Sequence, residues 1–288
     1  MKSVDAMHRV AAIQMVSGSD VAANLATVER LLIDAKNQGA ELVVLPEVFA
    51  LFGAKGQQAL GEQEASEAAR VRPFIRQQAK QLGLWIVAGT IPLRGDQADR
   101  VLASCFVVSD KGVEVARYDK LHLFDVDVGD KQGSYRESDT FKPGDKVVVI
   151  DTPFGRLGLA VCYDIRFPEF FRAMFDQGVD IIAVPAAFTL VTGKAHWLPL
   201  LRARAIENQC YIIGANQGGD HSPSRRTSGG SVIIDGWGNV LAEADMGEAC
   251  TLAAINLAEL DGHRAAMPIA QHRRFDVVFN QHGSDNSL

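Results

Sequence analysis

A cysteine stands between an apolar run and a cluster of charges in the segment GLAVCYDIRFPEF, residues 158–170. Cys162 is expected where a strand ends and a helix begins, so free backbone N–H groups and the helix dipole would favour the nucleophilic thiolate. A free cysteine in an apolar strand is more often a small hydrophobic residue. A core strand does not normally run straight into Asp164 and Arg166, however, and this context favours a nucleophile. The remaining cysteines lie inside strands or at their starts and are expected to be inert: Cys105, Cys210 and Cys250.

A cysteine nucleophile requires a base, and the carboxylates are more informative than the histidines. His122 and His196 are the better placed histidines, but neither belongs to a recognisable Cys/His signature. Glu47 ends the apolar strand LVVLPE. A carboxylate at the carboxyl end of a buried strand is expected near the ligand crevice of an α/β sheet, where it could act as a general base. The alternative is that Glu47 only caps the following turn.

A lysine ends a third strand-like segment, GVEVARYDK. A lysine at a strand end is most often an edge charge that discourages aggregation. Held next to the sulfur, the ammonium of Lys120 would instead stabilise a developing oxyanion. Glu47, Lys120 and Cys162 thus lie at the carboxyl ends of three separate strands, and this coincidence is stronger evidence for a site than any one of them.

An alternation of strand-like and helix-like segments must position these side chains. Strands are predicted at 8–16, 41–47, 84–93, 101–109, 112–119 and 180–188. A first helix is predicted to begin at Ser19 or Asp20 and to end near Gly39, and further helices are predicted at about 64–82, from Pro168 to Gly178 and at 196–209. Many strands are apolar without alternation, so both faces must be covered, which predicts a layered α/β architecture. The polar stretch 125–145 is long enough to suggest a functional loop. No linker divides the chain, which predicts a single domain over 1–288, with a core of about 8–260 and a weakly packed tail at 261–288.

The composition excludes several classes of function. The 288 residues are 47% hydrophobic and 22% charged, with a net charge of −6 and no local run of Lys and Arg, which disfavours nucleic acid and anionic membranes as partners. The N-terminus does not read as a signal peptide, and no segment is long and apolar enough to span a membrane. The four cysteines form no CxxC or Cys/His cluster, so we expect a reduced, cytoplasmic protein without a structural zinc site. A dinucleotide enzyme is also disfavoured, because no G-x-G-x-x-G follows a strand.

The segments LVVLPE, YDKLHLFD and GLAVCYDIRFPE resemble the three signatures of the nitrilase, or carbon-nitrogen hydrolase, superfamily. The resemblance implies that Glu47, Lys120 and Cys162 are catalytic, and GSYRES carries the family's second glutamate over to Glu137. It also implies a four-layer α-β-β-α sandwich. The stretch from 186 to 211 is similar to the branch of small amidases that contains deaminated-glutathione amidase and omega-amidase. Two departures, at Lys194 and at 227–231, concern regions that we expect to shape the pocket or subunit contacts.

The implied reaction cleaves a primary amide of a small carboxylate-bearing substrate to acid and ammonia through a thioester on Cys162. Glu47 would accept the thiol proton, while Lys120 and the backbone N–H of Tyr163 would stabilise the oxyanion. No metal or organic cofactor is implied. Arg136 and Lys194 are candidate partners of the substrate carboxylate.

Further side chains are assigned by type and position. Arg166 is another cation near the cysteine, and we interpret it as a structural partner of Asp164 or Glu169. Aromatic residues that would line the pocket, unless they only fill the core, are Phe49, Tyr163, Phe188 and Trp197. The segment QHRRF, with Arg273 and Arg274, resembles the family's terminal segment that crosses to another subunit, which implies a homodimer or a higher homo-oligomer.

Two alternatives remain open at this point. Within enzymes, the chain could be an omega-amidase or a true nitrilase acting on other small amides or nitriles. Outside enzymes, it could be a non-catalytic binding protein on the same fold, although the joint presence of Glu47, Lys120, Glu137 and Cys162 argues against this.

Overall fold

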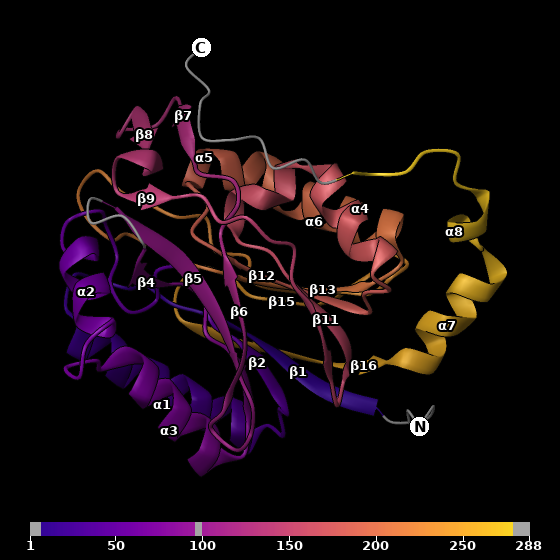
Figure 1. Cartoon of the computed structure of the whole chain (residues 1–288), viewed down its shortest axis with the longest axis horizontal. Coiled ribbons are helices and arrows are strands. Elements are labelled where there is room, and N and C mark those ends of the chain that lie inside the picture. Colours follow the sequence, from indigo (N-terminus) through magenta and orange to yellow (C-terminus); the bar gives the residue numbers. More distant parts are fainter. Residues whose placement is uncertain (1–6, 96–99, 279–288) are drawn as a thin grey trace.

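The structure is a computed structural model that describes residues 7–95 and 100–278. Within these residues, two large β-sheets lie face to face in the centre of the molecule (Figure 1). The first sheet has the strand order β16-β1-β2-β3-β5-β4, and β6 and β9 also pair with β5. Its strands are β1 (Met7–Gln14), β2 (Leu42–Val44), β3 (Trp85–Val87), β4 (Ile91–Arg94), β5 (Val101–Val108), β6 (Glu114–Asp119), β9 (Phe141–Lys142) and β16 (Ala249–Asn256).

The second sheet has the strand order β10-β11-β12-β13-β14-β15. Its strands are β10 (Val149–Thr152), β11 (Gly155–Leu159), β12 (Ile181–Ala186), β13 (Tyr211–Asn216), β14 (Val232–Ile234) and β15 (Val240–Glu243). Both sheets contain a parallel centre, β1-β2-β3 in the first and β11-β12-β13 in the second. Parallel strands bring their carboxyl ends to one edge, which is where loops with functional side chains gather.

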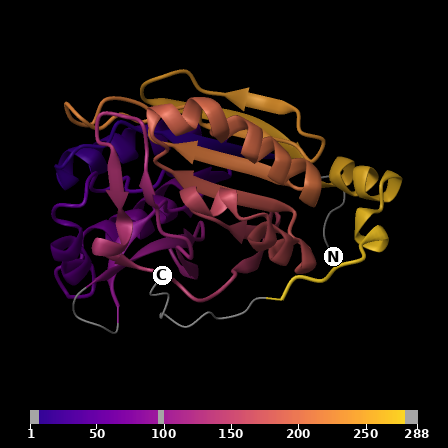
Figure 2. The ribbon, with the colours of Figure 1, turned by 90° about the horizontal axis from the view of Figure 1, so that it is seen from above.

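Helices cover the outer faces of both sheets. The first sheet is covered by α1 (Val21–Asn37) and α3 (Val71–Leu82), and the second by α4 (Pro168–Asp176) and α6 (Leu198–Asn208). Figure 2 looks down onto α4 and α6 and shows them lying over the strands, with the yellow C-terminal helices at one end of the molecule. The predicted four-layer α-β-β-α sandwich is therefore confirmed. The shorter helices are α2 (Gln57–Glu64), α5 (Leu190–Thr192), α7 (Leu257–Ala266) and α8 (Ile269–His272).

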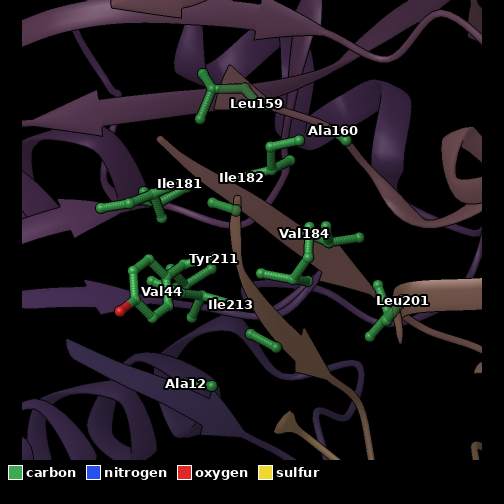
Figure 3. Packing of buried hydrophobic residues seen from close by; sticks show 14 of the residues in the cluster. Ala12, Val44, Leu159, Ala160, Ile181, Ile182, Val184, Leu201, Tyr211 and Ile213 are labelled. Atoms are coloured by element: carbon green, nitrogen blue, oxygen red, sulfur yellow. The ribbon is translucent and has the colours of Figure 1, made fainter. Parts of the chain in front are cut away.

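The lack of alternation in the strands follows directly from these layers. In β1, Val10 and Ala12 face the other sheet, whereas Ala11 and Ile13 face the helices. The same division recurs in β2 and β5, so each strand contributes one face to each of two apolar layers. Figure 3 shows part of the layer between the sheets, where side chains from both sheets pack together.

Several predicted elements differ from the structure. The helix predicted at about 64–82 is present only from Val71 to Leu82, as α3, because the preceding α2 already ends at Glu64. The strand predicted at 84–93 is broken into β3 and β4 at Gly89. The polar stretch 125–145 contains a small hairpin of β7 (Asp125–Asp127) and β8 (Ser134–Arg136). The segment predicted as a weakly packed tail is held in place at its start, because the guanidinium of Arg264 donates to Asp180 at 2.8 Å and to the carbonyl of Val179 at 2.6 Å.

The tail beyond residue 278 lies outside the described residues. In the part of the chain that is described, none of the helices combines the length and the apolar character that crossing a membrane requires.

Candidate active site

Cys162 lies just beyond β11 at a sharp turn of the chain. Its φ is +48°, a left-handed conformation that residues with a side chain rarely adopt, and it begins a short 3₁₀ helix, Cys162–Arg166. Such strained conformations persist only where the surroundings hold them, and they cluster at functional sites. The strand-to-helix turn predicted for Cys162 is therefore present, with a tighter helix than expected.

The buried carboxylate of Asp164 holds this turn. It accepts hydrogen bonds from the backbone N–H of Val161 at 2.7 Å and from the hydroxyl of Tyr118 at 2.6 Å. It also accepts from the backbone N–H of His122 at 3.2 Å and lies 2.7 Å from the Nδ1 of the same residue. Asp164 thereby joins the reactive turn of the second sheet to β6 and the following residues of the first sheet.

Glu47 follows β2 and lies at a second strained turn. The next residue, Val48, has a φ of +51°, and its backbone N–H donates to the hydroxyl of Thr90 at 2.8 Å. Gly89 lies directly against this turn, since a Cβ placed on it would be 2.0 Å from the carbonyl oxygen of Pro46. The break between β3 and β4 thus follows from the close approach of the backbone at Gly89 to the backbone at Pro46, and it leaves room for the turn that places Glu47 in the site.

A buried amide ties this turn to the second sheet. Gln217, which follows β13, donates to the carbonyl of Glu47 at 3.0 Å and to the hydroxyl of Ser17 at 2.9 Å. The position of Glu47 therefore depends on both sheets.

Lys120 follows β6 and is almost completely buried, with 1% of its surface exposed. Its Nζ donates to Oε1 of Glu47 at 2.7 Å and to Oε1 and Oε2 of Glu137 at 2.9 and 2.8 Å. Glu137 follows β8, and its Oε2 also accepts from the backbone N–H of Phe124 at 2.6 Å. The two carboxylates thus hold one ammonium between them, and the hairpin of the polar stretch supplies the second carboxylate.

The electrostatics of the cluster set its protonation. Burial opposes the positive charge of Lys120, but the carboxylates of Glu137 and Glu47 outweigh burial and raise the pKa of the ammonium well above its usual value. Burial also raises the pKa of Glu137, since Lys120 offsets it only in part. For Cys162, burial and the nearby Glu47 raise the pKa of the thiol well above its usual value, against the opposing effects of Lys120 and the backbone N–H of Ala187. Desolvation thus outweighs the backbone N–H groups that favour a thiolate, and the sulfur keeps its proton until a base takes it, which fits a mechanism in which Glu47 accepts the thiol proton.

One cavity of about 490 Å³ reaches Glu47, Lys120, Glu137 and Cys162 together. The residues that complete its wall come from loops at the carboxyl ends of both sheets, and among them are Phe52, Phe124, Tyr135, Arg136, Tyr163, Phe188, Thr189, His221 and Arg225. This volume suits a small organic molecule. Among the described residues, no group of three or more His, Cys, Asp or Glu side chains is arranged to hold a metal ion.

Only some of the side chains predicted to contact the substrate line the cavity. Tyr163 and Phe188 line the cavity, whereas Phe49 and Trp197 are buried in the core outside its lining. Lys194 is exposed on a π-helical turn, Gly193–Trp197, and is not part of the lining.

The two arginines differ as well. Arg136 lines the cavity but already pairs with Asp127 at 3.0 Å and donates to two backbone carbonyls. The interpretation of Arg166 as a partner of Asp164 or Glu169 is wrong, because its guanidinium lies 3.3 Å from Nδ1 of His196 and near the rings of Tyr163 and Phe188. Asp164 has no room for it, since its oxygens already serve donors from the turn and from β6.

Several lining residues were missed from the sequence, among them Phe52, His221 and Arg225. Phe52 and His221 stack with ring centroids 3.6 Å apart although 169 positions separate them in the chain, so no local pattern pointed to the pair. Thr227, in the departure at 227–231, holds the Nε2 of His221 at 2.7 Å, which explains why this departure matters for the cavity wall.

Several known proteins are similar to this chain in sequence and in fold. The family model described as carbon-nitrogen hydrolase matches residues 9–265. A deaminated glutathione amidase from Yersinia enterocolitica is 43% identical over 267 residues, 92% of this chain and 93% of that protein. The crystal structure of NitFhit from Caenorhabditis elegans has a TM-score of 0.88 at 35% identity, covering 95% of this chain and 67% of that chain. A mutant of the amidase from Nesterenkonia sp. AN1, with acrylamide added at its active-site cysteine, has a TM-score of 0.75 at 26% identity, covering 92% and 99%.

Proposed function

The chain belongs to the carbon-nitrogen hydrolase family, and on this premise we propose that it hydrolyses an amide of a small carboxylate-bearing molecule through a thioester on Cys162. The observation that carries the proposal is the placement of one ammonium, Lys120, between Glu47 and Glu137, in the cavity that also reaches Cys162. Amidase chemistry requires a nucleophile, a group that both accepts and donates a proton, and a fixed positive charge for the oxyanion. The cavity contains one side chain of each kind.

The first half of the reaction forms the thioester. Glu47 accepts the proton of the thiol as the sulfur of Cys162 attacks the amide carbon, and the carbonyl oxygen becomes an oxyanion. Lys120 and the backbone N–H of Tyr163 stabilise that charge. When the carbonyl re-forms, the C–N bond breaks and Glu47 returns the proton to the nitrogen, which leaves as ammonia or an amine. Protonation is required because amide nitrogen is a poor leaving group.

The second half of the reaction releases the acid. Glu47, again ionised, takes a proton from a water that attacks the thioester carbon, and the C–S bond breaks as the carboxylic acid forms. The sulfur then recovers the proton from Glu47. Glu137 holds Lys120 throughout and positions substrate or water, because its carboxylate is anchored both to the ammonium and to the backbone N–H of Phe124.

The substrate that the relatives favour is deaminated glutathione, since the 43% identical protein from Yersinia enterocolitica carries the name of its amidase. Glutathione is a tripeptide, so its deaminated form has only secondary amides and a carboxylate at each end. Its cleavage would release an amine fragment, whereas a primary monoamide of a short dicarboxylic acid would release ammonia. Parallel assays of deaminated glutathione, a short dicarboxylic monoamide and a simple nitrile, each followed by product mass, therefore separate the proposed activity from an omega-amidase and from a nitrilase.

The assigned roles are tested by Glu47→Gln, which keeps the shape of the side chain but removes its ability to take a proton. We expect a folded protein in which turnover falls by at least about 1000-fold, since both steps use this base. Cys162→Ala should be equally inactive, and Cys250→Ala, at a half-buried cysteine outside the cavity, should retain activity. Full activity in a folded Glu47→Gln protein would exclude this role.

A non-catalytic binding protein on the same fold is the remaining alternative. In a mutant of the Nesterenkonia amidase, in which a glutamate is replaced by glutamine, acrylamide has added to the active-site cysteine. We expect acrylamide to modify Cys162 in the same way and substrate to protect it. A protein that binds amides without turning any of them over, and whose Cys162 is unreactive, would support the binding-protein alternative.

We further propose that the protein works in the reducing cytoplasm as a homodimer. Support for an interface comes from large apolar side chains that stay exposed on the described surface, among them Ile206 on α6 and Trp237 in the β14–β15 turn. Arg273, in the segment expected to cross to a partner, pairs with Asp176 on α4 of its own chain. Light scattering that finds only monomer at micromolar concentration would contradict the dimer.

A further inference from the structure

The loop between β13 and β14 forms one wall of the cavity and folds back on itself. The segment 220–226 closes through a backbone β-bridge between residues 220 and 226, and the backbone N–H of His221 donates to the carbonyl of Arg225 at 3.0 Å. His221, Ser222, Ser224 and Arg225 from this loop all line the cavity.

The ring of His221 anchors this loop to the body of the protein. Its Nδ1 lies 2.8 Å from the carbonyl of Ser17, which can only accept, so Nδ1 carries the proton, and Nε2 then accepts from the hydroxyl of Thr227. Burial lowers the pKa of His221 to about 4, so the ring is neutral at pH 7, as this arrangement requires. The ring also stacks on Phe52. The loop is therefore a fixed part of the wall.

Arg225 is held by aromatic faces rather than by a carboxylate. Its guanidinium carbon lies 4.6 Å from the ring centre of Tyr135 and 5.7 Å from that of Phe52. Its Nη2 donates to the carbonyl of Ala187 at 3.3 Å, and its buried Nη1 has no hydrogen-bond acceptor among the described residues. Arg225 also acts electrostatically on Asp130, whose carboxylate accepts from the hydroxyl of Tyr135 at 2.6 Å. Stacking fixes a guanidinium in place without neutralising it.

The other cations of the cavity wall are already neutralised. Lys120 lies between two carboxylates, and Arg136 pairs with Asp127. Within residues 7–95 and 100–278, no carboxylate lies within ion-pair distance of Arg225. Arg225 is therefore a cation of the wall that has no direct carboxylate partner among the described residues, and an anionic group of a bound molecule could pair with it.

Arg225 also lies close to the reactive sulfur. The carbonyl of Ala187 accepts from Arg225, while the backbone N–H of the same residue acts on the sulfur of Cys162. A single residue thus separates the guanidinium from the nucleophile. A carboxylate that reaches Arg225 while the scissile carbonyl is at Cys162 must therefore be only a few bonds from that carbonyl.

We propose that Arg225 binds a carboxylate on the acyl part of the substrate and so selects short amides of dicarboxylic acids. This inference rests on the proposed function, whose site it extends, and it replaces Arg136 and Lys194 as the expected carboxylate partners. A bound carboxylate would accept charge-assisted hydrogen bonds from the guanidinium, whose Nη1 has no acceptor among the described residues, while the aromatic faces keep the group preorganised.

The test compares Arg225→Gln with the wild type on the monoamide of glutaric acid and on the methyl ester of that monoamide, which lacks the negative charge. We expect kcat/KM for the charged monoamide to fall by about 10- to 100-fold, mainly through KM, as for loss of charged hydrogen bonds. The ester should change by less than about threefold. Arg225→Lys should recover part of the loss for the monoamide.

Arg226→Gln is the matched control, because Arg226 is the next residue, is exposed and pairs with Asp220 at 2.7 Å without lining the cavity that contains Cys162. It should leave both substrates unchanged. Equal losses on the two substrates in Arg225→Gln would show a structural role for Arg225, and an unchanged kcat/KM for the monoamide would show no role in binding it. Either result overturns the proposal.

A binding experiment separates failure of this inference from failure of the proposed function. Titration calorimetry of glutarate into Cys162→Ala protein requires no turnover. We expect the added Arg225→Gln change to weaken glutarate binding by at least about 10-fold and the added Arg226→Gln change to leave it unaltered. Equal affinity with and without Arg225 would overturn the carboxylate site even if amidase activity is present. If no amide is hydrolysed by the wild type, the proposed function fails, while the calorimetry still decides the role of Arg225.

Discussion

Replacing Tyr118 with phenylalanine removes one oxygen atom from beneath the reactive turn. That hydroxyl donates to Asp164 at 2.6 Å and accepts from the backbone N–H of Leu121 at 3.2 Å. Tyr118 is 1% exposed and Asp164 is fully buried, so water cannot take over either bond. Leu121 directly follows Lys120. The hydroxyl of Tyr118 therefore helps to hold both the turn of Cys162 and the backbone next to Lys120.

The size of the effect follows from what remains. A hydrogen bond to a buried charge contributes about 1.5–3 kcal/mol, and a backbone N–H left without an acceptor adds about 1 kcal/mol. The carboxylate of Asp164 keeps its donors from Val161 and His122, so the larger penalty of an uncompensated buried charge, about 3–5 kcal/mol, does not apply. We therefore expect Tyr118→Phe to lower the free energy of unfolding by about 2–4 kcal/mol.

Urea unfolding followed by tryptophan fluorescence measures this difference, and amidase assays measure its consequence. The matched control is Tyr211→Phe, because the hydroxyl of Tyr211 makes two bonds of similar length, 3.0 and 3.1 Å, to neutral backbone groups of Asn256. We expect the control to lose about 1 kcal/mol with unchanged kcat/KM, and Tyr118→Phe to lose about 10-fold in kcat/KM. If the two variants lose equal stability, the hydrogen bond from Tyr118 to the carboxylate of Asp164 stabilises the protein no more than a bond to a neutral group does, and the expected difference is contradicted.

Other perturbations test separate parts of the site. Gly89→Ala should lower stability by about 3 kcal/mol or more in thermal unfolding and reduce kcat, because the new Cβ would lie 2.0 Å from the carbonyl oxygen of Pro46, whereas Gly18→Ala, in open space, should be tolerated. His221 has a pKa of about 4 when folded and near 6.5 when unfolded, so the unfolded chain binds the extra proton and stability is lost as pH falls from 6.5 towards 4. His221→Gln should flatten that loss by up to about 3 kcal/mol, and identical pH profiles of the two proteins would contradict it. Glu137→Gln should fold normally but lower kcat by about 10- to 100-fold in steady-state assays, since it removes one of the two carboxylates that hold the ammonium of Lys120, the proposed oxyanion stabiliser; an unchanged kcat would exclude a positioning role.

The meeting of Glu47, Lys120 and Cys162 could be anticipated from the sequence because each follows a segment with the pattern of a strand. Parallel strands end at a common edge, so polar side chains at several strand ends converge whatever the connections between them. The covering of both sheet faces was equally predictable, since runs such as Val10 to Ile13 have no polar side to expose. Both features follow from short stretches of sequence, the ends of strands and the apolar runs within them, so they can be predicted from local sequence patterns.

The substrate end of the cavity could not be predicted because its geometry is non-local. Arg225 gains its surroundings from Phe52, Tyr135 and Ala187, which are distant in the chain and meet only in the fold. Lys194 has the right charge, but its π-helical turn places it at the surface.

The protonation state of Cys162 could not be predicted from the sequence for a similar reason. The helix-terminal position of Cys162 favours a thiolate, but the packing around the sulfur determines its desolvation, and that outweighs the backbone groups. The length of an apolar run likewise did not reveal the break at Gly89, which results from the approach of Pro46.

The sulfur of Cys162 as the acyl carrier is tested most directly by acid-quenching the wild-type protein during turnover of glutaric monoamide and locating any added mass by peptide mass spectrometry. The peptide that contains Cys162 should gain the mass of the acyl group in the wild type and in Cys250→Ala, and no peptide should gain it in Cys162→Ala. Steady turnover by the Cys162→Ala protein, or an acyl group attached to any other residue of the wild type, would contradict the mechanism.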